Sequence, residues 1–269
     1  MSSEELHNVF DEKAINILNF FLKRGEIIQP EHVTKSGEIS YKIPPEHLEI
    51  WFSQAIGWES IGAGNYPIDL ISKDKKSGAD VVKVVYRVNK DRSLSLGTTN
   101  EKSIFQKFGD DLWGKNEEED TLDEMFIKEN LMGIGNSANN IFFDKINSVK
   151  GIDNLYYFYF LFPPAGVDDV YLCGLKVMKD HKLLINNLEL TSQKKSVVLH
   201  DFIDSRYGQT KVYKAKKRFE IRLRASTFVE NGKVIKLNVN NKVKAINLRN
   251  LSDEDFESYV TNKFKDQLN

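Results

Sequence analysis

The 269-residue sequence contains a single cysteine, Cys173, and lacks any long apolar run. One cysteine cannot form an internal disulfide, and this one lies among apolar residues, so we expect a buried strand residue rather than a nucleophile. A membrane-spanning helix needs about 20 consecutive apolar residues. The first residues, Met1-Ser2-Ser3-Glu4-Glu5, are acidic, whereas a secretory signal begins with basic residues. These features predict a cytoplasmic protein without a membrane segment.

Several catalytic signatures are also missing. The five histidines stand apart in the sequence, with no His-x-x-x-His pair, which argues against a zinc site. The chain has neither the Gly-x-x-x-x-Gly-Lys-Ser/Thr loop of nucleotide hydrolases nor the Gly-x-Ser-x-Gly turn of serine hydrolases. We therefore expect no nucleotide cofactor.

Two carboxylates and one ammonium group lie on a predicted β-hairpin. The apolar runs 66–71 and 79–85 flank a turn rich in Ser, Asp, Lys and Gly, a pattern typical of two paired strands. Asp69 lies in the first run, and Asp80 and Lys83 lie in the second. Carboxylate oxygens are the ligands that Mg²⁺ prefers, and a lysine can orient a water molecule and offset charge on a phosphate. The hairpin therefore has the residues that a metal-dependent phosphodiesterase needs.

This spacing resembles the PD-(D/E)XK nuclease superfamily, to which most type II restriction endonucleases belong. The resemblance covers residues 67–83. In that family the first Asp follows a Pro or an apolar residue, and the second acid shares the next strand with the Lys. The resemblance implies that Asp69 and Asp80 hold Mg²⁺ and that Lys83 positions the attacking water or helps to deprotonate it.

The spacing departs from the family pattern in the second strand. The family places one residue between the second acid and the Lys, whereas two residues separate Asp80 from Lys83. Because side chains alternate along a strand, these two would face opposite sides. A β-bulge or a twist at the strand end near Val81 would bring both onto one face, and bulges are common beside active sites.

A further acid precedes the hairpin. Apolar residues at helical spacing predict a helix over 44–59, with Glu59 at its end. The family often has an extra acid on the helix before the first catalytic strand, so the resemblance implies that Glu59 assists through the metal shell. The alternative is a solvated acid at a helix end.

A basic segment lies in the C-terminal half, although the net charge is only -1. Acids concentrate elsewhere, within 110–124, so the charge is polarised in a way that suits a DNA-binding cleft. The alternative is an edge strand whose lysines discourage aggregation. The candidate DNA-binding residues are Arg206, Tyr207, Gln209, Lys211, Lys214, Lys216, Lys217, Arg218, Arg222 and Arg224.

Periodicity and turn residues predict the remaining elements. Helices are expected over 4–24, 101–108, 121–149 and 252–264, the last with Ser252 and Asp255 forming a capping box. The apolar run 155–162 predicts a strand buried on both faces. Further strands are expected over 170–178, 183–190, 196–202, 210–223 and 234–243.

Together these elements predict one α/β domain over residues 1–269, with a mixed central sheet flanked by helices and a β-rich C-terminal half. We expect the catalytic core at about 44–165, a DNA-contacting part at about 166–250 and a closing helix at 252–267.

The predicted function is a Mg²⁺-dependent, sequence-specific endonuclease of restriction type that cuts double-stranded DNA. Because cutting both strands usually needs two sites, and most oligomers are two-fold, we expect a homodimer. Two alternatives stay open: a non-catalytic DNA-binding or protein-interaction module, and a repair or recombination nuclease without sequence preference.

Overall fold

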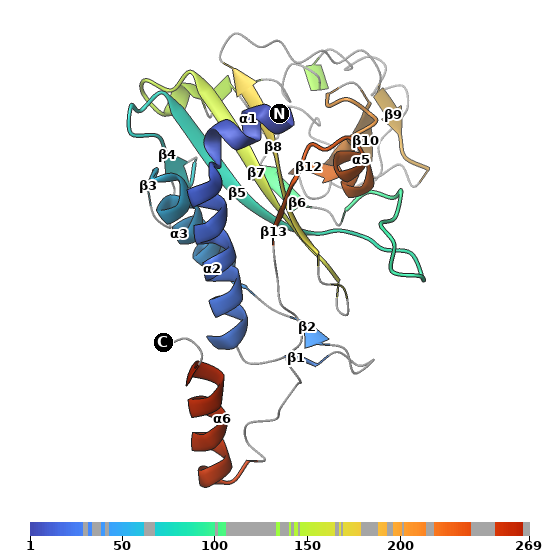
Figure 1. Ribbon diagram of the computed structural model, residues 1–269. Helices are drawn as coiled ribbons and strands as arrows, with labels where there is room; N and C mark the ends of the chain where they lie inside the picture. Colours follow the sequence, from blue (N-terminus) through green and yellow to red (C-terminus); the bar gives the residue numbers. More distant parts are fainter. Residues whose placement is uncertain are drawn as a thin grey trace, which may run out of the picture.

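Three layers make up the fold: a layer of helices, a six-stranded sheet and a five-stranded sheet (Figure 1). The computed structural model describes residues 1–28, 32–33, 39–40, 43–61, 68–99, 102–105, 133–134, 140, 143–144, 146–164, 167, 169–178, 188–192, 196–200, 202–213, 218–237 and 251–265.

The helical layer consists of α1 (Ser3–Val9), α2 (Glu12–Ile28) and α3 (Pro45–Ile56). The single helix predicted over 4–24 is wrong, because the chain turns between α1 and α2 and α2 continues past residue 24. Asp11 causes the break: its Oδ1 accepts a hydrogen bond from the backbone N–H of Ala14 (2.7 Å), which caps a new helix start. The short strands β1 (His32–Val33) and β2 (Ile39–Ser40) pair with each other after α2.

The six-stranded sheet has the order β13-β8-β7-β5-β4-β3. Its strands are β3 (Glu59–Ser60), β4 (Leu70–Ile71), β5 (Ser77–Val85), β7 (Asn154–Phe162), β8 (Val170–Met178) and β13 (Ile235–Leu237). β5 and β7 run parallel, while the other neighbours are antiparallel, which confirms the mixed central sheet. The predicted hairpin is β4–β5, and the predicted buried strand is β7.

The second sheet is antiparallel throughout, with the order β6-β12-β11-β10-β9. Its strands are β6 (Lys102–Phe105), β12 (Arg218–Leu223), β11 (Gly208–Tyr213), β10 (Ser196–Leu199) and β9 (Leu188–Leu190). The helix predicted over 101–108 is wrong, because 102–105 pair with β12. The strand predicted over 210–223 is a hairpin, β11–β12. Most of the helix predicted over 121–149 lies outside the described residues.

Two apolar cores hold the layers together. One lies between the helices and the first sheet, where the ring of Phe10 contacts Phe52 (5.4 Å between centroids) and Phe158 (4.9 Å). The other lies between the two sheets and includes Cys173, which is fully buried in β8 as predicted. Burial raises the pKa of its thiol well above the usual range, which makes it a poor nucleophile.

Two helices complete the described fold. α5 (Ala225–Glu230) follows β12 and packs Phe228 into the core between the sheets. α6 (Asp253–Lys265) confirms the predicted C-terminal helix, and the backbone N–H of Asp255 donates to Ser252 Oγ (3.1 Å) at its start. α6 stands clear of both sheets (Figure 1). Within the described ranges, no helix combines the length and apolarity needed to cross a bilayer.

Candidate active site

Asp69 is tied to β5 at the point where β4 begins. Its backbone N–H donates to the carbonyl oxygen of Ala79 (2.9 Å), and its Oδ2 accepts from the backbone N–H of Val81 (2.8 Å). The regular β4–β5 pairing covers only Leu70 and Ile71, so the Asp69 carboxylate supplies an acceptor where a backbone carbonyl would otherwise pair. Asp80 lies between the two β5 residues that Asp69 contacts. The Asp69 carboxylate is therefore fixed next to Asp80.

Asp80 is a carboxylate inside β5 with only 8% of its surface exposed. Its neighbours Ala79 and Val81 face the helices, so the alternation of the strand turns Asp80 toward the second sheet. Two buried tyrosines on that side respond to it: burial chiefly raises the pKa of Tyr157 and Tyr159, and the charge of Asp80 raises both further. A carboxylate in this surrounding is poorly solvated, and buried charges in proteins are paired or coordinate a metal.

Glu49 is a third carboxylate whose charge is coupled to Asp69 and Asp80, and the sequence prediction missed it. Burial raises the pKa of Glu49 to about 7, and the negative charges of Asp69, Glu46 and Asp80 add to the shift, in that order. α3 carries Glu49 one residue after the fully buried Leu48. A signal was present in the sequence: Glu49 precedes Phe52 by three residues and Ile56 by seven, which places an acid on the apolar stripe of its helix.

Lys83 lies on the other side of β5. The pairing of β5 with β7 is continuous from Ser77 to Val85, without the bulge near Val81 that would have turned Lys83 toward Asp80. Lys83 Nζ instead donates to the carbonyl oxygen of Ile43 (2.8 Å) and lies 4.7 Å from the ring centroid of Phe162. Lys83 thus ties β5 to the residues that lead into α3. Its role in positioning water stays a prediction, and this geometry favours a structural one.

We expect Lys83→Met to lower the free energy of unfolding by about 1–2 kcal/mol, because the Ile43 carbonyl and the Phe162 ring both lose the ammonium group. Urea unfolding measures the change, and Lys76→Met, in the exposed β4–β5 turn, is the matched control. If Lys83→Met leaves the free energy of unfolding unchanged but abolishes DNA cleavage, the result would instead favour the role predicted from the sequence, in which Lys83 positions the attacking water.

Glu59 does not lie on the helix where it was expected. α3 ends at Ile56, followed by Gly57 in the left-handed conformation (φ 69°), and Glu59 belongs to the edge strand β3, opposite Ile71. Its side chain is exposed. The helix predicted over 44–59 is therefore too long, and the acid that α3 brings to the site is Glu49.

The donor set suits Mg²⁺ in its chemistry. Among the residues that the structure describes, no three His, Cys, Asp or Glu side chains are arranged to hold a metal ion together. Mg²⁺ needs no such cage, since it is often held by one or two carboxylates, with waters and substrate phosphates completing the shell. The Tyr159 hydroxyl is buried near Asp80 without a hydrogen-bond partner in the described part of the chain, an arrangement typical of a site for bound water or an ion. Asp80, which lies near this hydroxyl, and Asp69 beside it are the two predicted carboxylates that could take part in such a site.

The predicted DNA-binding residues lie around the second sheet and α5. Gln209 and Lys211 alternate with the buried Gly208, Thr210 and Val212, so they share the outer face of β11. Arg222 pairs with Gln209 across the β11–β12 ladder, and its guanidinium donates to the Tyr213 hydroxyl (2.8 Å). Burial, and then the charge of the nearby Arg87, lowers the pKa of Arg222. This face therefore carries Lys211 and Arg222, together with the buried Glu220 directly opposite Lys211.

The other members of the segment are placed less uniformly. Arg206 is exposed and bonded to Asp204 (Nε to Oδ1, 2.9 Å), while Tyr207 packs edge-on against Phe228. Arg224 is exposed at the start of α5. Arg218 begins β12, but its side chain lies outside the described part. Lys214, Lys216 and Lys217 also lie outside the described residues.

Comparisons of the chain with protein-family models, with curated proteins and with solved structures found no match.

Proposed function

We propose that this protein is a Mg²⁺-dependent endonuclease of restriction type that hydrolyses double-stranded DNA at a specific sequence. The observation that supports the proposal is the placement of Asp69 beside Asp80, fixed by the hydrogen bond from the Val81 N–H to the Asp69 carboxylate (2.8 Å). Two carboxylates on neighbouring strands of a hairpin, one of them fixed to the backbone next to the other, could serve as a ligand pair for a hard divalent cation.

Each acidic residue has its own part in this proposal. Asp69 and Asp80 would hold Mg²⁺, and Glu49 would take the place first given to Glu59, as a third acid on the preceding helix whose charge is coupled to both. When bound, Mg²⁺ would polarise the scissile phosphate and promote ionisation of a water. Lys83 acts as a positioning residue, because it ties the start of α3 to β5 and so holds Glu49 against the hairpin.

Incubation of the purified protein with supercoiled plasmid tests the activity. We expect discrete fragments with Mg²⁺ and intact plasmid with EDTA. A smear instead of discrete fragments would favour the repair or recombination nuclease without sequence preference. Intact plasmid with Mg²⁺ or Mn²⁺, across substrates of varied sequence, would favour the non-catalytic DNA-binding or protein-interaction module.

The polar face of β11 and β12 is the surface that we propose for DNA. Lysines contact phosphates, while glutamine can pair with base edges. Gln209 and Lys211 lie two residues apart on this face, with Arg222 beside them on β12. This arrangement would combine a sequence-independent contact with one that reads bases.

Lys211→Gln is expected to weaken binding to all DNA sequences by up to about tenfold and to lower the slope of log affinity against log salt by about 1. Fluorescence anisotropy in a salt series, with Ca²⁺ in place of Mg²⁺ to prevent cutting, measures both quantities. Lys76→Gln removes one positive charge from the β4–β5 turn and serves as the control. An equal loss in both variants would mean that only net charge matters and that the β11 face does not bind DNA.

A further inference from the structure

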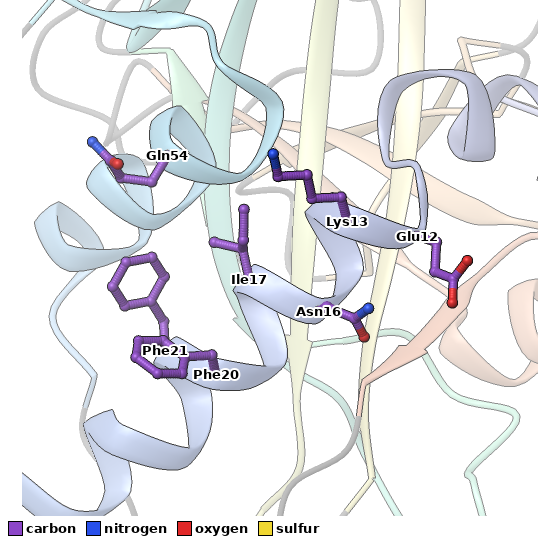
Figure 2. A pocket seen from close by; sticks show the side chains of 7 residues that line it. All are labelled: Glu12, Lys13, Asn16, Ile17, Phe20, Phe21 and Gln54. Atoms are coloured by element: carbon purple, nitrogen blue, oxygen red, sulfur yellow. The ribbon is translucent and has the colours of Figure 1, made fainter. Parts of the chain in front are cut away.

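A hollow of about 680 Å³ opens on the outer side of the helical layer, between α2 and α3 (Figure 2). Ile17, Phe20 and Phe21 supply its apolar surface from α2, and Gln54 approaches from α3. Phe20 is 49% exposed. Ile50, one turn before Gln54 on α3, is 53% exposed. With the apolar lining of the hollow, Phe20 and Ile50 give this side of the helical layer exposed apolar surface.

A second apolar surface lies on α6. The described side chains of this helix, 253–258 and 261–262, are exposed or nearly so, and Phe256 is 43% exposed. The sequence of α6 places Phe256, Tyr259, Val260 and Phe264 at helical spacing, while acids fill its first turn. An amphipathic helix of 13 residues gains most of its stability from packing its apolar side, so α6 needs a partner surface.

The α2–α3 hollow and α6 are complementary when the two helices run antiparallel. In that register Phe256 would lie beside Phe20 and Phe21. The acidic start of α6, Asp253–Asp255, meets Lys23 on α2. At the other end of the hollow, Glu12 and Lys13 lie side by side on α2. One register would thus place the apolar position of α6 on the apolar lining and its acidic first turn near Lys23, with the helix dipoles opposed.

We propose that α6 of one chain docks in the α2–α3 hollow of a second copy, and that the exchange is reciprocal. Within one chain α6 stands clear of the sheets, so that Phe20 and Phe256 both keep exposed surface (Figure 1). A reciprocal exchange about a two-fold axis covers two hollows with two helices and closes the assembly as a dimer. The proposal concerns assembly and does not depend on the nuclease activity.

Disulfide formation between two variants tests whether the α6 helix in the hollow comes from the same chain or from a second copy. A Phe20→Cys chain and a Phe256→Cys chain are mixed and oxidised, and we expect a covalent two-chain species on a non-reducing gel, in clear excess over either variant alone. The native Cys173 is fully buried and should not interfere. When both substitutions are made in the same chain, the reciprocal exchange should again give disulfides between two chains. An internal disulfide in a monomer would show that α6 folds back on its own chain and would overturn the proposal.

Sedimentation of the full chain tests the same contact without crosslinking. We expect a dimer whose dissociation constant rises about tenfold in Phe20→Glu, whereas Leu96→Glu, on an exposed loop after β5, leaves it unchanged. Lys23→Glu and Glu254→Lys should each weaken the dimer, and their combination should restore it. A monomer at all concentrations, or equal weakening by Phe20→Glu and Leu96→Glu, would overturn the exchange.

Discussion

Replacement of Asp69 by asparagine is expected to lower Mg²⁺-dependent plasmid cleavage by about 10³-fold or more while the chain stays folded. The substitution is chosen for the structural role of this side chain. Asp69 Oδ2 accepts a hydrogen bond from the Val81 N–H (2.8 Å), and an asparagine carbonyl oxygen can accept the same bond. Asp69→Asn therefore keeps the link between β4 and β5 and removes only the negative charge that would hold the metal.

Asp74→Asn is the matched control for this experiment. Asp74 lies in the turn of the same hairpin, and its Oδ1 accepts from Ser72 Oγ and from the Lys76 N–H (3.0 Å). Asparagine can keep these bonds too, so Asp74→Asn should cut DNA at the wild-type rate. Initial rates at saturating plasmid, with circular dichroism spectra of each variant, make the comparison. Equal activity of wild type and Asp69→Asn would remove Asp69 from the metal site and with it the main support for the proposed function.

The hairpin and the central strand could be predicted from the sequence because their signals are local. Alternating and continuous apolar runs bounded by turn residues define β5 and β7, which are found at the expected positions, whereas β4 is shorter than its run and covers only Leu70–Ile71. The position of Asp69 beside Asp80 follows from this hairpin. The alternation of side chains also indicated that Asp80 and Lys83 face opposite sides, and the uninterrupted β5–β7 pairing agrees with the simple pattern.

The remaining features depend on contacts between distant segments. Residues 102–105 have a helix-like sequence, but they pair with β12, more than 110 positions away, and this pairing decides their conformation. The sequence offers Glu49 and Glu59 as two glutamates that precede the hairpin. Only the packing of α3 on the first sheet brings Glu49 toward the hairpin. The Lys83 bond to Ile43 joins residues 40 positions apart, and no local pattern indicates it.

The environment of Glu49 leads to the second large effect: Glu49→Gln should stabilise the metal-free protein at pH 8 while lowering Mg²⁺-dependent cleavage by about 10²-fold. Burial, with the charges of Asp69, Glu46 and Asp80, raises the pKa of Glu49 from 4.5 to about 7. Below pH 4.5 the carboxyl is protonated in both the folded and the unfolded chain, so its full contribution to stability is present. As pH rises toward 7, the unfolded chain releases this proton first, and the folded state loses stability.

The expected loss between these pH values is about 1 kcal/mol, because the half-exposed side chain is partly screened by solvent. Glutamine has no such titration, so the free energy of unfolding of Glu49→Gln, measured in urea with EDTA, should match that of the wild type at pH 4 and exceed it at pH 8.

Mg²⁺ at pH 8 should then raise the melting temperature of the wild type more than that of Glu49→Gln, since a bound cation offsets the repulsion among the carboxylates. Glu46→Gln, on the exposed side of the same helix, should show a smaller change in both measurements. If Glu49→Gln is no more stable than the wild type at pH 8, then the three carboxylates do not share one electrostatic environment. If Glu49→Gln lowers cleavage and raises the free energy of unfolding, then the repulsion among the carboxylates destabilises the metal-free protein but serves to bind a cation.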